Sequence, residues 1–262
     1  MVLLLLSTAQ KICGQSPAIP EITAAANSYL FTTTTSSVVF GNPACADTAV
    51  SFGLGAYANR SFLVQELTET GAALMVRLPA NTYLSAGCMK KGYSLFSRNY
   101  IAIAMSKYFG SSFCAGLRLE RTGFVQGENY GSETSWNVAA GALVKISQRM
   151  DAASCFKLPV VQQDDKLLGD FSFGLRYRFS GLFSLNAEAA LAGNAAVVRG
   201  AILYRPRSEI EIVAGIGGKP LMTSFGCVLH LKSLSLLIAA AHVPVTGYSP
   251  SVGCSYVNHY NR

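Results

Sequence analysis

The chain has 262 residues, of which 13% are charged and 50% are apolar, and its formal net charge is +7. A positive mean hydropathy excludes a disordered chain, and no apolar run approaches the ~18 residues that a membrane-spanning helix needs. The cations are dispersed, without the basic, aromatic-interleaved patch that follows a phosphate backbone, so we expect no nucleic-acid partner.

The N-terminal part of the chain contains no strand pattern. Residues 2–6 form an apolar run followed by Ser7, Thr8 and Ala9, and we interpret residues 1–15 as a signal peptide that lacks its positive leading segment. Residues 16–47 are irregular. Within them we expect a short helix at residues 22–30, a polar run at 32–37 and a turn at 42–44. This segment is expected to plug or cap the periplasmic mouth of the domain formed by residues 48–262.

Strand periodicity begins near residue 48 and is clearest at residues 170–179. The odd positions there are apolar or aromatic, while the even ones include Ser172, Gly174, Arg176 and Arg178. Residues 182–191 repeat the pattern after a tight turn. In all we predict fourteen strands, at residues 48–57, 70–78, 82–90, 100–108, 113–122, 135–147, 150–158, 170–179, 182–191, 195–205, 210–216, 222–231, 234–241 and 251–257.

These strands indicate an all-β transmembrane antiparallel up-and-down barrel. Their number is even, and most have about the nine or ten residues that a tilted strand needs to cross a bilayer. The predicted connections alternate between mostly long and uniformly short, as the external loops and periplasmic turns of outer-membrane barrels do. The alternative is a soluble two-sheet sandwich, in which the apolar faces would meet a second sheet.

The polar faces of the strands predict which side chains line the lumen. The candidates are Arg77, Arg118, Glu120, Lys145, Arg176, Arg178, Glu188, Arg199, Arg205 and Glu211, together with His230. These groups could select anionic solutes, or they could form a structural ladder of Arg and Glu pairs, which we favour because buried charges need partners. Strands 100–108 and 234–241 are apolar on both faces, so their orientation is left open.

The sequence gives little sign of catalysis or of a cofactor. The three histidines share no local frame with a candidate Ser and Asp, and the seven cysteines show no metal-ligand spacing. Residues 215–219 contain glycines before a lysine but lack the spacing of a phosphate-binding loop. We therefore expect no enzymatic activity, no metal and no cofactor.

Three short stretches resemble the PorV/PorQ-type outer-membrane barrels of Bacteroidota, which are distant relatives of the FadL fatty-acid transporters. The stretches are residues 42–44, 92–96 and 242–250. The motif residues are Asn42, Pro43, Gly92, Tyr93, His242, Pro244, Gly247 and Pro250.

This resemblance implies a fourteen-stranded barrel in a Gram-negative outer membrane, with a partly occluded lumen and both termini in the periplasm. It also implies partners, since some such proteins work with other outer-membrane barrels or lipoproteins in type IX secretion. Our first hypothesis is a non-enzymatic accessory subunit of an outer-membrane secretion or assembly complex. The alternative is a FadL-like channel for small hydrophobic or anionic solutes.

Overall fold

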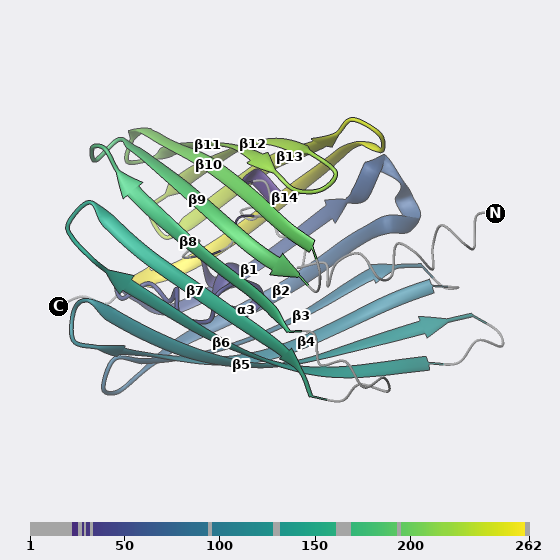
Figure 1. Cartoon of the computed structure of the whole chain (residues 1–262), viewed down its shortest axis with the longest axis horizontal. Helices are drawn as coiled ribbons and strands as arrows, with labels where there is room; N and C mark the ends of the chain where they lie inside the picture. The colour runs from purple at the N-terminus through teal and green to yellow at the C-terminus, as the bar shows by residue number, and fades with distance from the viewer. Residues whose placement is uncertain are drawn as a thin grey trace.

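The computed structural model describes residues 23–25, 28, 30–31, 34–93, 96–127, 132–160, 169–192 and 195–259. Its fourteen strands form one closed antiparallel barrel, in which each strand pairs with its neighbours in the chain and β1 pairs with β14 (Figure 1). The predicted architecture is confirmed. Among the described residues, no helix has the length and apolar character needed to cross a membrane.

The strands are close to those predicted from the alternation. They are β1 (Val50–Arg60), β2 (Thr68–Leu78), β3 (Thr82–Gly92), β4 (Phe96–Phe109), β5 (Phe113–Gln126), β6 (Ser132–Lys145), β7 (Met150–Pro159), β8 (Asp170–Arg178), β9 (Phe183–Ala192), β10 (Ala195–Arg207), β11 (Ile210–Gly217), β12 (Met222–Leu231), β13 (Leu234–Val243) and β14 (Gly247–His259). Two short 3-10 helices, η1 (Ser61–Leu63) and η2 (Gln65–Leu67), connect β1 to β2.

Side-chain burial follows the period of two along each strand. In β8 the outward Phe173 is 45% exposed, whereas its neighbour Ser172 is 2% exposed. Exposed apolar side chains therefore cover the outside, and small or polar side chains face the lumen. The alternation also orients the two strands that the sequence leaves open, since Tyr100 and Ala102 of β4 and Ala239 of β13 point inward.

Several strands extend beyond their expected ends, so the loop alternation is weaker than predicted. Pairing between β3 and β4 continues to Gly92 and Ser97, and only residues 93–95 connect these strands. β14 likewise begins at Gly247 instead of residue 251. The expectation that every second connection is mostly long holds only in part, because ladder hydrogen bonds continue through residues that the sequence suggests are loop, as far as Gly92 in β3 and back to Gly247 in β14.

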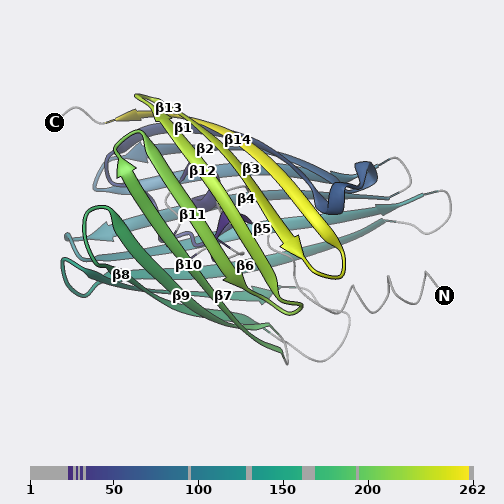
Figure 2. The ribbon, with the colours of Figure 1, turned by 90° about the horizontal axis from the view of Figure 1, so that it is seen from above.

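An N-terminal segment lies inside the barrel. We call its described residues, from Thr23 to Ala49, the plug; they include helix α3 (Thr35–Phe40) (Figures 1 and 2). This helix occupies part of the run that we expected to be irregular. It is stabilised by burial, because Val38 and Val39 are completely buried and Phe40 is nearly so.

The two ends of the barrel differ in what they carry. β1 begins and β14 ends at the same end, where Val50 pairs with His259. We call this the near end and the opposite one the far end. The connections from β2 to β3, β4 to β5, and every second one onward lie at the near end. The predicted signal peptide and the N-terminus itself lie outside the described residues.

Candidate functional site

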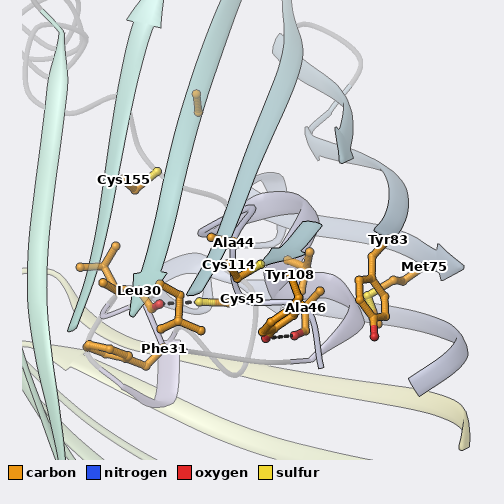
Figure 3. Packing of buried hydrophobic residues seen from close by; sticks show 14 of the residues in the cluster. Leu30, Phe31, Ala44, Cys45, Ala46, Met75, Tyr83, Tyr108, Cys114 and Cys155 are labelled. Atoms are coloured by element: carbon orange, nitrogen blue, oxygen red, sulfur yellow. Dashed lines mark hydrogen bonds between the residues drawn. The ribbon is translucent and has the colours of Figure 1, made fainter. Parts of the chain in front are cut away.

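The lumen is filled by the plug, which packs against the inner wall in three apolar clusters. In the largest, Leu30 and Cys45 of the plug meet Tyr108, Cys114 and other wall residues (Figure 3). The backbone of the plug is also bound directly, since the Tyr108 hydroxyl donates a 2.7 Å hydrogen bond to the carbonyl oxygen of Ala46. The plug is therefore part of the core of the barrel.

Inward-facing glycines allow the plug to approach the wall closely. A Cβ atom on Gly116 of β5 would lie 2.5 Å from the carbonyl carbon of Pro43, and one on Gly141 of β6 would collide with Asn42. On β3, a Cβ atom on Gly87 would lie 2.7 Å from the ring of Phe40. These wall positions cannot hold a larger residue without displacement of the plug.

The first of three ionic clusters joins the plug to β5. Glu120 is completely buried, and it accepts hydrogen bonds from Arg118 at 3.0 Å and from the Tyr100 hydroxyl. Lys157 of β7 forms an ion pair with the same carboxylate. Arg118 also donates to the carbonyl oxygens of Val39, at 3.3 Å, and Gly41 in the plug. One buried carboxylate thus orients the guanidinium that holds the plug backbone.

The second cluster centres on Asp151 of β7, which is also completely buried. Arg176 donates to its Oδ2 from Nε at 2.8 Å and from Nη2 at 2.6 Å, and Arg178 pairs with the same oxygen. Arg176 reaches the plug as well, through a 3.3 Å hydrogen bond to the carbonyl oxygen of Phe31 and by stacking on the Phe31 ring.

The third cluster centres on Glu188 of β9. Arg199 of β10, its direct cross-strand partner, donates to Oε1 at 2.8 Å. The other oxygen accepts hydrogen bonds from the Ser28 hydroxyl at 3.1 Å and from the Leu30 backbone N–H at 3.4 Å. All three clusters therefore bind plug atoms as well as wall atoms, which supports the structural interpretation of the lumen charges over an anion-selective one.

The remaining predicted lumen residues lie toward the near end. Arg77 donates to Thr48 and Asn81 and lies over the Tyr83 ring. Arg205 pairs with Glu211 across the β10–β11 hairpin. Lys145 lies on the inward-facing side of β6, but it is the last residue of the strand and its side chain is exposed. The Nδ1 atom of His230 lies 2.9 Å from the Ser235 hydroxyl.

Sequence reasoning missed three members of these clusters, namely Asp151, Lys157 and Tyr100. A signal for two of them was present, because Asp151 and Lys157 are charged residues on the same face of one strand, separated by alternate small residues. Tyr100 could not be assigned, because both faces of its strand are apolar and only the barrel shows which one meets the plug.

The residues of the family resemblance lie at bends. Asn42 accepts a hydrogen bond from the Ala44 N–H and donates one to Leu30, so it closes a buried turn with Pro43. Gly92 has φ +107 and precedes Tyr93, whose N–H binds the carbonyl oxygen of Phe96 at 2.7 Å. Asn42 and Gly92 therefore each stabilise a local turn of the backbone.

The C-terminal motif forms the β13–β14 hairpin at the far end. The His242 and Tyr248 rings pack with centroids 4.5 Å apart, and Gly247 has φ +94. Pro244 and Pro250 are exposed. These residues shape the hairpin, and none of them enters the lumen clusters.

The six cysteines among the described residues divide between the two sides of the wall. Cys45, Cys114 and Cys155 are buried in the largest apolar cluster, whereas Cys88, Cys227 and Cys254 are exposed on the outer surface. Burial raises the pKa of the Cys45 thiol in the plug. Within the described ranges, no group of three His, Cys, Asp or Glu side chains is arranged to hold a metal ion.

A cavity of about 290 Å³ remains between the plug and the wall formed by β10 to β14. Phe31 of the plug closes one side, and Leu203, Val213, Val228 and Leu237 form much of the opposite wall. Polar groups gather at its near end, where Arg205, Glu211, His230, Lys232 and Ser233 contribute to the lining. The site is therefore a cavity of mixed character, with an apolar wall on one side and polar groups that include Arg176 and Asn186 as well as those at the near end.

The outer wall is organised by height as well as by face. Because the strands of a barrel are tilted, paired residues on neighbouring strands lie at different heights along the barrel axis. Residues at equal height are displaced along each successive strand by a constant number of positions. When paired residues are traced from a residue of β1 through each successive strand and back to β1, the path ends about fourteen residues nearer the far end. Residues at equal height on neighbouring strands are therefore displaced from pairing by about one residue.

With this step, several outward aromatic side chains gather in two rings, while Phe156, Phe171, Phe173 and Phe225 lie at heights between them. The ring toward the near end contains Phe109, Phe113, Tyr177, Phe183, Tyr204 and Tyr256. The ring toward the far end contains Trp136, the only tryptophan, together with His242 and Tyr248. About eight residues separate the rings along a strand, which is roughly 20 Å in height. The wall between them is apolar.

Fold, plug and cavity together define a class of protein: a closed fourteen-strand antiparallel barrel whose lumen is occupied by its own N-terminal segment. No family model and no curated protein matches the sequence. Solved structures do match the fold. The CymD monoaromatic hydrocarbon channel superposes with a TM-score of 0.71 at 11% identity, covering 95% of this chain and 100% of that one.

Two further structures agree with this result. The Pseudomonas putida toluene transporter TodX gives a TM-score of 0.68 at 10% identity, covering 92% of this chain and 97% of TodX. A Pseudomonas aeruginosa FadL homologue gives 0.61 at 11% identity, covering 91% and 98%. At these identities the likeness establishes a FadL-like barrel fold.

Proposed function

We propose that the protein is an outer-membrane channel for small hydrophobic solutes. The observation that carries this proposal is the cavity between Phe31 and the wall of β10 to β14, where Leu203, Val213, Val228 and Leu237 form an apolar surface. The proteins that share the fold are described as a monoaromatic hydrocarbon channel and a toluene transporter, so the architecture is compatible with this role.

A membrane position is supported by the two aromatic rings on the outer wall. Barrels of the bacterial outer membrane have an outward apolar band about 25 Å tall between aromatic girdles. The separation of roughly 20 Å found here is close to that height. We propose that the near end, with its short turns, faces the periplasm and that the far end faces outward.

The cavity suits a small aromatic hydrocarbon. An apolar cavity of about 150 Å³ is sufficient to bind benzene, so about 290 Å³ has room for a substituted single ring. Leu203, Val213 and Leu237 offer apolar contact to such a ring. The cations of the three lumen clusters are held by Glu120, Asp151 and Glu188 and by plug carbonyl groups, which favours a hydrophobic solute over an anionic one.

The accessory-subunit hypothesis, with its PorV/PorQ assignment and its protein partners, stays a prediction. The exposed apolar residues of the outer wall are accounted for by contact with lipid. A lateral protein partner would use the same surface, so the surface does not favour the partner over lipid.

The proposal is tested by uptake of labelled toluene into Gram-negative cells whose own hydrocarbon channels have been deleted. Cells that produce the protein should take up toluene faster than cells that do not. Leu237→Trp fills the cavity and should abolish the gain. Ile238→Trp is the matched control, because the neighbouring Ile238 points outward and is 72% exposed.

Three results would contradict the proposal. In the first, cells with and without the protein take up toluene at the same rate while the protein is present and folded in the outer membrane. In the second, the two tryptophan variants behave alike. In the third, the folded protein remains in solution without detergent, as the alternative of a soluble two-sheet sandwich would predict.

A further inference from the structure

Three cations point outward at the far end of the barrel. They are Arg60 of β1, Lys90 of β3 and Arg121 of β5, and all three are exposed. The seven ion pairs found among the described residues all involve lumen-facing side chains, and none includes these cations. They are therefore available to a ligand outside the barrel.

The register places the three cations at one height. The ladder through Lys90 meets β1 at Ala58, two residues before Arg60, and meets β5 at Gly123, two residues beyond Arg121. Lys90 lies two strands away from each of the other two cations. A displacement of two residues in these directions is therefore the one expected for residues at equal height, given the step of about one residue per strand. The cations thus form a row along one side of the barrel, with neighbours about 12 Å apart.

The row coincides with the far-end rim of the apolar band. Trp136 is the direct cross-strand partner of Arg121, and tryptophan is typical of the membrane interface. Below the row on the same strands, the outward positions are apolar or small, among them Ala58, Leu84 and Leu119. The cations therefore lie where headgroups of the outer leaflet would begin.

The outward-facing strand positions at this rim carry charge of one sign. Across the described strands, no Asp or Glu occupies an outward-facing position. At the near-end rim, Lys107 of β4 and Arg207 of β10 face outward, on strands that lie far apart round the barrel. The far-end cations instead lie close together on β1, β3 and β5, so the far end presents a clustered site to an anionic headgroup.

We infer that this row binds the phosphate groups of a phosphorylated glycolipid of the outer leaflet, of the lipid A type. The inference rests on the proposed membrane orientation but not on transport. Cations about 12 Å apart can each reach a different phosphate of one bisphosphorylated headgroup or of adjacent ones, and arginine binds phosphate oxygens in a bidentate manner.

The test is native mass spectrometry of the purified, folded barrel in detergent, titrated with bisphosphorylated lipid A. The triple variant R60Q/K90Q/R121Q should bind on the order of a hundredfold more weakly, since each interfacial cation contributes about fivefold. The variant K107Q/R149Q/R207Q removes the same charge at the near end and should bind like the wild type. Dephosphorylated lipid A and phosphatidylglycerol should both bind weakly to the wild type.

The inference is overturned if the far-end triple variant binds as tightly as the wild type, or if the near-end variant weakens binding equally. Equal binding of dephosphorylated lipid A would also overturn it. If the triple variant does not fold, the single variants and the charge-retaining R60K and R121K replace it, and each lysine variant should bind more tightly than the corresponding glutamine variant because it keeps the charge. Toluene uptake of the far-end variant should remain normal, so failure of lipid binding and failure of transport are separable.

Discussion

Gly116 and Gly141 are direct partners across the β5–β6 ladder, and together they form the surface on which Asn42 and Pro43 of the plug rest. The pair explains how a short segment can pack against the wall of a fourteen-strand barrel. The wall has no side chains at these two positions, so the plug can turn directly against its backbone. The position of the plug and its turn at Asn42 and Pro43 both depend on these glycines, because a side chain at either one would occupy the space of the plug.

Gly141→Val should displace the plug while the barrel still forms. The added methyl groups would collide with Asn42, and overpacking of this kind costs about 1–3 kcal/mol. Limited proteolysis of the folded protein should then cleave within the plug, where the wild type resists. Gly123→Ala is the control, because nothing lies within 4 Å of a Cβ atom at that position. Equal protease resistance of both variants would contradict the close approach.

Arg118→Met should destabilise the protein strongly. It leaves the buried Glu120 with one cation fewer and removes the donor to Val39 and Gly41. Loss of one partner from a buried pair costs about 3–5 kcal/mol. The temperature at which the barrel unfolds in detergent, read from its heat-modifiable migration on gels, should fall. Lys107→Gln, on the outer surface, should leave it unchanged; a wild-type temperature for Arg118→Met would show that the cluster is not stabilising.

Cys45 should not react with alkylating reagents in the folded protein. Its pKa is raised by burial, so at pH 8 the side chain remains a thiol, and the thiolate is the reactive form. Mass spectrometry after treatment with N-ethylmaleimide should find Cys45 unmodified until the barrel is unfolded, while Cys227 on the outer surface is modified by this lipid-soluble reagent. Rapid modification of Cys45 in the folded state would mean that the plug opens.

Leu117→Arg should hinder folding into a bilayer. Leu117 is 57% exposed and lies near the middle of the apolar band, where an arginine costs about 2–4 kcal/mol. Phe113→Arg places the same charge at the near-end ring, where the cost is about 0–1 kcal/mol. Urea titration of folding into phospholipid vesicles measures the difference. If the outer wall faced water, both variants would be tolerated equally.

Much of the fold follows from the sequence because a strand's face is a local property. Residues 170–178 predict their own inside and outside from the alternation of Phe173 with Gly174 and Arg176, without knowledge of any other strand. Fourteen such segments then predict the barrel, and the charged members of each polar face are the ones that line the lumen clusters.

The partners of those residues required the tertiary structure. Arg176 binds Asp151, and Glu188 binds Ser28, because register and chain path bring together positions far apart in the sequence. The row of Arg60, Lys90 and Arg121 likewise exists only through the shear of the closed barrel. The sequence by itself determined which residues face in and which face out, since that depends on a period of two. Only closure of the barrel around the plug decided which of them meet, since register is set by pairing between distant strands.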